Sequence, residues 1–215
     1  MTEMNLNRLE KIFDQEMKAF LIAIDDFPWE NREAYAHWLG QTYYLVRHTT
    51  RFASLTASRI GFHDEDLHRQ LLKHLREEIG HEMLALNDLK NLGWNIEQVP
   101  ETNYAKLMIQ TQYYWIEQSP YSHFGFIWCL ESLASRRGRK IMSRIESAHG
   151  DPCYSFLDVH SEVDGGHSAE IHNVVKKFNP SEYALVAETL QQTSYLYSRM
   201  LHELKERIKT TQKIA

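Results

Sequence analysis

The 215-residue sequence predicts an all-α fold, built as a bundle of seven helices. Apolar residues recur at the three- and four-residue spacing of amphipathic helices, and no strand-like alternation of apolar and polar residues persists. The nine glycines and five prolines are few for a chain of this length, which suits helices joined by short turns. A single domain over residues 1–215 is therefore expected.

Apolar stripes and glycines delimit the first four helices. Gly61 follows the second stripe and Gly93 follows the third, as expected for the residue that ends a helix. Pro28 suits the first turn of the second helix, where a missing N–H costs nothing. The expected helices run from about Asn5 to Asp25, from Pro28 to Ile60, from Asp64 to Gly93, and onward from Pro100.

A capping residue followed by proline marks the start of each of the last three helices. These pairs are Ser119-Pro120, Asp151-Pro152 and Asn179-Pro180. The helix after Ser119-Pro120 is expected to continue to about His149. Glu182, three residues after Asn179, completes the pattern of a capping box.

Composition excludes several classes of function. The net charge is −5 and no tract of lysine or arginine occurs, so nucleic-acid binding is not expected. No secretory leader pattern is present, and no apolar stretch approaches the roughly 20 residues that span a bilayer. The only cysteines are Cys129 and Cys153, which suits a reducing compartment. We expect a cytoplasmic protein that does not contact membranes.

Two motifs carry the chemistry. On one helix, His160, Asp164 and His167 would form a continuous stripe, from which two imidazoles and a carboxylate can ligate the same metal ion. Glu78 and His81 form a Glu-x-x-His pair, the spacing used by dinuclear carboxylate sites in helical bundles. Together they predict a non-haem metal site, with diiron as the preferred interpretation.

Glu131 supplies a third carboxylate from the centre of another predicted helix. Its neighbours in the sequence are mostly apolar, and an unpaired carboxylate buried among them would cost several kcal/mol, which a metal ion would offset. Three carboxylates nearly balance two Fe(II) ions, and neutral imidazoles complete the coordination. The expected ligands are Glu78, His81, Glu131, His160, Asp164 and His167.

Each motif has an alternative interpretation. A Glu-x-x-His pair and a His-x-x-x-Asp-x-x-His stripe also occur on exposed helix faces. Glu77 is adjacent to Glu78 and is the alternative ligand, and Glu131 could instead pair with Arg136 or Arg137. Gly165 and Gly166 favour either local unwinding or close helix packing.

The six residues, in this order, resemble the haem-oxygenase-like diiron oxidases and oxygenases, and the resemblance covers nearly the whole chain. The seven-helix outline is similar to that of haem oxygenases, TenA proteins and the pyrroloquinoline quinone synthase PqqC. The Glu-x-x-His spacing is closest to that of the fatty-acid decarboxylases that make terminal alkenes. The resemblance implies two Fe(II) ions, O2 as co-substrate, and a fatty acid, amino acid or amine as the small organic substrate.

Three alternatives remain open. A TenA-like thiamine-salvage hydrolase would use Cys129 as its nucleophile, although a buried cysteine is more often inert core. A cofactor-free oxidase similar to PqqC and a non-catalytic helical binding protein are the others. Some of the aromatic side chains on the second, fourth and fifth helices are expected to line a cavity beside the metals. A homodimer is expected, because symmetric pairs are the commonest assemblies.

Overall fold

The computed structural model describes residues 4–150, 153–162 and 166–214, and these residues are helical with short connections and no strand. The all-α prediction is confirmed. Three short 3-10 segments cover Phe62–Asp64, Ile96–Gln98 and Pro120–Ser122. The α-helices are α1 (Leu6–Asp26), α2 (Arg32–Val46), α3 (Thr49–Arg59), α4 (Glu65–Glu78), α5 (His81–Asn91), α6 (Asn103–Gln118), α7 (His123–His149), α8 (Ser155–Glu162), α9 (Gly166–Val175) and α10 (Pro180–Ile214).

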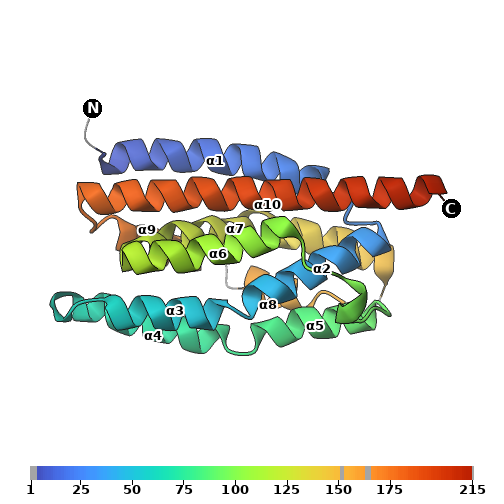
Figure 1. Cartoon of the computed structure of the whole chain (residues 1–215), viewed down its shortest axis with the longest axis horizontal. Coiled ribbons are helices and arrows are strands. Elements are labelled where there is room, and N and C mark those ends of the chain that lie inside the picture. Colours follow the sequence, from blue (N-terminus) through green and yellow to red (C-terminus); the bar gives the residue numbers. More distant parts are fainter. Residues whose placement is uncertain (1–3, 151–152, 163–165, 215) are drawn as a thin grey trace.

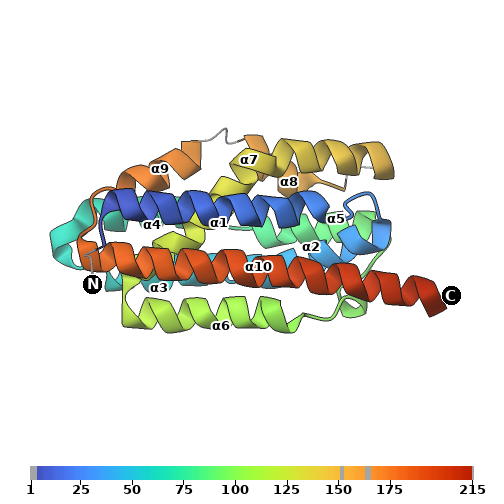
Figure 2. The same cartoon turned by 90° about the horizontal axis from the view of Figure 1, so that it is seen from above.

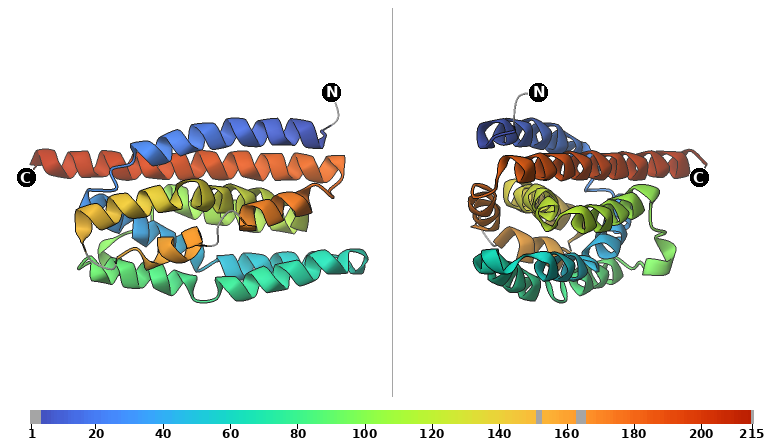
Figure 3. Two further views of the ribbon diagram at one scale, coloured as in Figure 1. Left: turned by 180° about the vertical axis from the view of Figure 1, so that it is seen from behind. Right: turned by 60° about the vertical axis from the view of Figure 1, so that its left-hand side comes forward.

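The helices form layers. Helices α1 and α10 lie side by side on one side of the molecule (Figures 1 and 2), and α10 also packs on α6 and α7. Helices α3, α4 and α5 lie on the opposite side, with α7 between the two layers (Figure 1). The short helix α8 contacts both α7 and α5 and lies between them (Figure 3). No helix in the described part of the chain is long and apolar enough to cross a membrane.

Aromatic side chains with satisfied polar atoms form much of the core. The indole N–H of Trp38 donates to the hydroxyl of Tyr197 at 2.9 Å, and that of Trp29 donates to the carbonyl of Ile24 at 2.8 Å. Helices α7 and α10 approach closely at Gly125, where an added Cβ would lie 2.2 Å from the carbonyl oxygen of Val186. Only glycine fits this crossing.

The predicted cap at the start of α10 is confirmed. The side chain of Asn179 accepts the backbone N–H of Glu182 at 3.1 Å, and the carboxylate of Glu182 accepts the backbone N–H of Asn179 at 2.8 Å. This reciprocal capping box satisfies two backbone donors that the helix itself leaves unpaired.

Two predicted continuous helices are each divided in two, which corrects the predicted outline. The second divides at Arg47 and His48 into α2 and α3. The third divides at Gly80, whose φ of 91° lies in the left-handed region that ends a helix. The sixth predicted helix is described in two parts, α8 and α9, and Asp151-Pro152 and residues 163–165 lie outside the described residues.

Candidate metal centre

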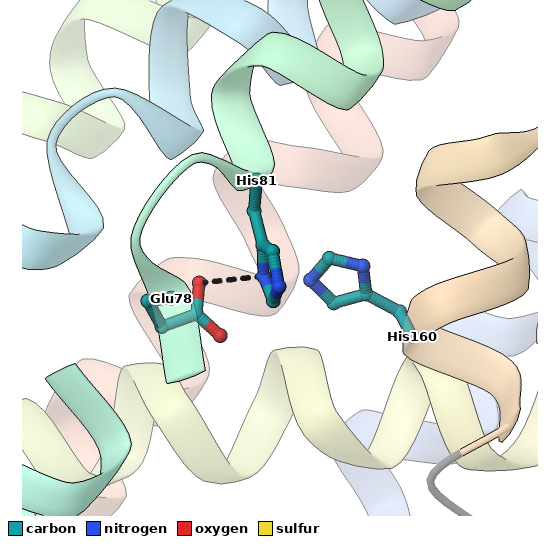
Figure 4. A group of neighbouring side chains, drawn as sticks. All are labelled: Glu78, His81 and His160. Atoms are coloured by element: carbon teal, nitrogen blue, oxygen red, sulfur yellow. Dashed lines mark ion pairs between the residues drawn. The ribbon is translucent and has the colours of Figure 1, made fainter. Parts of the chain in front are cut away.

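Glu78 and His81 lie on either side of the turn between α4 and α5. Glu78 is the last residue of α4 and His81 is the first of α5, so the pair does not share one helix face as predicted. The turn directs Ile79 to solvent, with 64% of its surface exposed, and it brings the two polar side chains together. The Nδ1 atom of His81 lies 3.5 Å from Oε2 of Glu78 (Figure 4).

His160 approaches this pair from α8. Its ring faces that of His81, with a centroid distance of 4.7 Å and an interplanar angle of 68° (Figure 4). The Nδ1 atom of His160 lies 2.7 Å from the carbonyl oxygen of Phe156. Since a carbonyl only accepts, Nδ1 carries the proton and Nε2 keeps its lone pair, as in a metal-binding histidine.

Glu78 belongs to two groups of possible ligands. In the first, ligand atoms of Glu78, His81 and His160 all lie within 4.8 Å of one another. In the second, the same holds for His74 of α4, Glu78 and Glu131 of α7. Glu78 is therefore the residue that the two groups share, and four helices supply the donors.

The electrostatics favour a charged Glu78 carboxylate and a neutral His160 ring. Glu78 is only 7% exposed. Burial raises its pKa, but interactions with His81, His160 and His74 outweigh this effect and lower the pKa to about 2. Burial lowers the pKa of His160, which favours the neutral ring. A buried carboxylate beside the neutral ring of His160 is a suitable environment for a cation.

The donor atoms of these carboxylate and histidine side chains are suitable ligands for iron. The buried Nδ1 atom of His81 has no hydrogen-bond partner in the described part of the chain, because 3.5 Å to Glu78 is too long for a hydrogen bond. Such a polar atom is costly unless a ligand or ion satisfies it. Carboxylate oxygens together with imidazole nitrogens are the donors that non-haem Fe(II) uses.

A cavity of about 120 Å³ lies beside these residues. Glu78, Glu131 and His160 contribute to its wall. Apolar side chains make up most of the remaining wall, and no lysine or arginine lines it among the described residues. The representative apolar residues are Ile24, Trp29, Trp38, Leu45, Phe126, Ile141, Phe156 and Met200.

The structure brings together four of the six predicted ligands: Glu78, His81, Glu131 and His160. Of the other two, Asp164 lies outside the described residues, and His167 lies in α9 with its side chain undescribed. Of the predicted stripe, His160 lies in α8 and His167 in α9, and residues 163–165 between them lie outside the described part of the chain. His74 is an additional candidate that the sequence analysis missed. The four-residue spacing between His74 and Glu78 could have indicated this, because it places both side chains on one face of α4.

The neighbouring alternatives are placed elsewhere. Glu77 lies 3.5 Å from Lys73, so Glu78 and not Glu77 enters the centre. Arg137 binds the carboxylate of Asp25 at 3.1 Å. The Cys129 thiol is fully buried, its pKa is raised by burial, and it is not among the described residues that line the cavity.

The expectation that some aromatic side chains of the predicted helices line the cavity is confirmed. Phe126 lines the cavity, whereas Tyr43, Tyr44, Tyr113 and Tyr114 do not. Four further aromatic rings line the cavity, two of them within residues 28–60, the range predicted for the second helix. They are Trp29, Trp38, Phe156 and Tyr197.

Solved structures share this fold at low sequence identity. A domain of unknown function with a haem-oxygenase-like fold, from Shewanella denitrificans, has a TM-score of 0.83 and 18% identity, covering 100% of this chain and 97% of that chain. A TenA homologue from Pseudomonas syringae has a TM-score of 0.77 and 11% identity, covering 92% of each chain. A CADD-like protein of unknown function from Nostoc punctiforme has a TM-score of 0.66 and 14% identity, covering 93% and 96%.

These similarities show a haem-oxygenase-like fold, as the resemblance implied. No curated protein matches the sequence. The family model of iron-containing redox enzymes matches residues 36–206, which include Glu78, His81, Glu131 and His160. The chain belongs to this haem-oxygenase-like family of iron-containing redox enzymes.

Proposed function

We propose that this protein is a non-haem diiron enzyme that uses O2 to oxidise a small organic substrate. The observation that carries the proposal is the pair of overlapping ligand groups that share Glu78. A buried carboxylate common to two groups suits a bridge between two metal ions. Two ferrous ions, when bound, would supply the reducing electrons for oxygen chemistry.

The proposed ligands are the six predicted residues, of which Asp164 and His167 would complete the set from the segment around the start of α9. Within the described residues, each helix has a distinct role. Helix α8 orients His160 through the hydrogen bond from its Nδ1 to Phe156. The turn at Gly80 sets Glu78 and His81 side by side, and α7 presents Glu131 to the same cavity.

The cavity supports a substrate with a small apolar body. Its volume of about 120 Å³ is close to that of an engineered apolar cavity of about 150 Å³ that binds benzene. Because no lysine or arginine lines the cavity among the described residues, a substrate carboxylate or amine would be placed beside Glu78, Glu131 and His160, where the metal ions would bind. Of fatty acids, amino acids and amines, those with short aliphatic chains fit best.

The alternatives gain less support. A hydrolase that depends on Cys129 needs an accessible thiolate, whereas this thiol is buried and its pKa is raised. A cofactor-free oxidase or a binding protein has no need for a charged buried carboxylate beside a histidine nitrogen that lacks a hydrogen bond.

Anaerobic titration of metal-free protein with Fe(II), followed by iron analysis, tests the proposal. We expect two ions per chain, and O2 consumption by the loaded protein that increases with a short-chain aliphatic acid or amine. The variant Glu78→Gln should lose both ions, because both groups share this residue. The matched control Glu77→Gln changes the neighbouring exposed carboxylate and should retain both. A wild-type protein that binds fewer than two iron ions per chain would refute the proposal.

A further inference from the structure

We propose that His74 is a ligand of one of the two metal ions, a role outside the six predicted residues. In this arrangement His74, Glu78 and Glu131 hold one ion, and Glu78, His81 and His160 hold the other. The inference rests on the proposed diiron function. It assigns the described ligands to separate ions, which the sequence pattern left open.

The position of His74 on α4 supports this role. His74 lies one helical turn before Glu78, and Leu67 and Leu71 precede it at the three- and four-residue spacing of the same face. Leu67, Leu71 and Glu78 are all buried, so this face is the one that α4 turns to the interior. His74 therefore projects from the buried face of the helix that supplies Glu78.

The immediate surroundings of His74 suit a metal ligand. A ligand nitrogen of His74 and carboxylate oxygens of Glu78 and Glu131 lie within 4.8 Å of one another, although the three residues come from two helices. Two carboxylates would provide the negative charge that a divalent ion requires, and His74 would add a nitrogen donor. Its ring also lines the cavity that contains Glu131 and His160.

Other histidines near α4 have different surroundings. His68, on the same helix, has its Nδ1 atom 2.9 Å from the carbonyl oxygen of Ala57 and belongs to neither ligand group. His63 is exposed in the 3-10 segment before α4. The assignment of His74 thus depends on its specific place and not on the abundance of histidine in this part of the chain.

A second pocket reaches His74 from outside. This pocket of about 340 Å³ lies between α4, α7 and α9, and His74 and Ile127 line both it and the apolar cavity. Its polar residues include Glu77, Lys73 and Glu170. Apolar side chains of α4, α7 and α9 complete its lining, so this mixed pocket gives a hydrated metal ion a route to His74 that does not cross the apolar cavity.

Anaerobic Fe(II) titration against a chromophoric chelator, with iron analysis, provides a readout independent of turnover. The wild-type protein should bind two ions. The variant His74→Ala should bind one ion with unchanged affinity, and the other at least about tenfold more weakly, because it loses a ligand. The variant His160→Ala should weaken the binding of one ion in the same way, while the double variant should weaken both.

Two further variants make the result decisive. His63→Ala removes an exposed histidine and should retain two ions with unchanged affinity. His74→Gln keeps a long side chain that is compatible with a helix, so this variant should have the circular dichroism spectrum of wild type. It should still bind the ion assigned to His74 more weakly. If wild type binds two ions and both His74 variants do so with unchanged affinity, His74 is not a ligand. If wild type binds fewer than two, the diiron proposal itself fails.

Discussion

The carboxylate of Asp88, on α5, accepts the backbone N–H of Phe156 at the start of α8, with an oxygen–nitrogen distance of 2.9 Å. It also accepts the backbone N–H and the hydroxyl of Ser155 at 3.0 and 2.7 Å. Asp88 is 1% exposed. Because α5 begins with His81 and α8 carries His160, this cap joins the two helices that present the facing histidines.

Replacing Asp88 by alanine should therefore affect both stability and metal binding. The buried N–H groups of Ser155 and Phe156 would lose their acceptor, which should cost about 1–3 kcal/mol of unfolding free energy. Displacement of α8 should weaken the ion held by His81 and His160 more than the ion assigned to His74. Urea denaturation of metal-free protein and anaerobic Fe(II) titration measure the two effects.

Asp66→Ala is the matched control, because this α4 carboxylate is exposed and lies 3.7 Å from Arg69. It should change stability by less than about 0.5 kcal/mol. If Asp88→Ala reduces stability but leaves both iron affinities unchanged, the cap does not position His160.

Gly80 determines the geometry of Glu78 and His81 through its backbone. Its φ is 91°, and an added Cβ would meet no atom within 4 Å, so Gly80→Ala introduces backbone strain without a steric clash. We expect a loss of about 1–2 kcal/mol of unfolding free energy. We also expect weaker iron binding, because relief of the strain would move His81 away from Glu78.

Gly93→Ala separates these two effects. Gly93 has a φ of 80° and equally open surroundings, but it follows α5 at the end opposite His81. A similar loss of stability with unchanged iron affinity is expected there. Equal iron affinities in the two variants would show that the turn at Gly80 does not set the ligand geometry.

Much of the fold could be predicted from local physical signals. The apolar stripe of α1 and the capping box of Asn179 and Glu182 lie where the sequence placed them. The helix breaks were missed because periodicity continues across them. At Gly80 a glycine was visible in the sequence, but only the left-handed backbone shows that the helix ends there.

The candidate site was less accessible from the sequence. Residue type and spacing identified four of the candidate ligands, Glu78, His81, Glu131 and His160. The three-residue spacing of Glu78 and His81 indicated one helix face, but a turn between α4 and α5 brings these two side chains together. His74 was missed because several other histidines are scattered along the chain, and spacing alone does not show which helix face is buried.

Cys129→Ala distinguishes an iron enzyme from a hydrolase that depends on a thiolate. The thiol is completely buried and does not line the cavity, so its removal should leave iron stoichiometry and O2 consumption within about twofold of wild type. The small loss of packed volume should cost roughly 1 kcal/mol of stability. Complete loss of turnover in a folded, iron-loaded variant would favour the thiolate mechanism.

His123 should make the metal-free protein less stable as the pH falls. Its side chain is 2% exposed, and burial, followed by the neighbouring His74, lowers its pKa to about 3. In the unfolded chain His123 has the ordinary pKa of 6.5, so it is protonated below that pH. In the folded protein it stays neutral down to about pH 3. The contribution of His123 to the free energy of unfolding is therefore complete above pH 6.5. Below that pH it decreases by at most about 1.4 kcal/mol per pH unit.

Urea denaturation of the chelator-treated protein at pH 7 and pH 5 measures this effect, and His123→Phe isolates it from the other titrating groups. Phenylalanine keeps an aromatic ring beside Phe52 and Phe126 but takes up no proton. Over this interval wild type should lose about 2 kcal/mol more than the variant, because one proton is taken up over roughly 1.5 pH units. Equal losses in the two proteins would mean that His123 is protonated in the folded state, in contradiction to its burial.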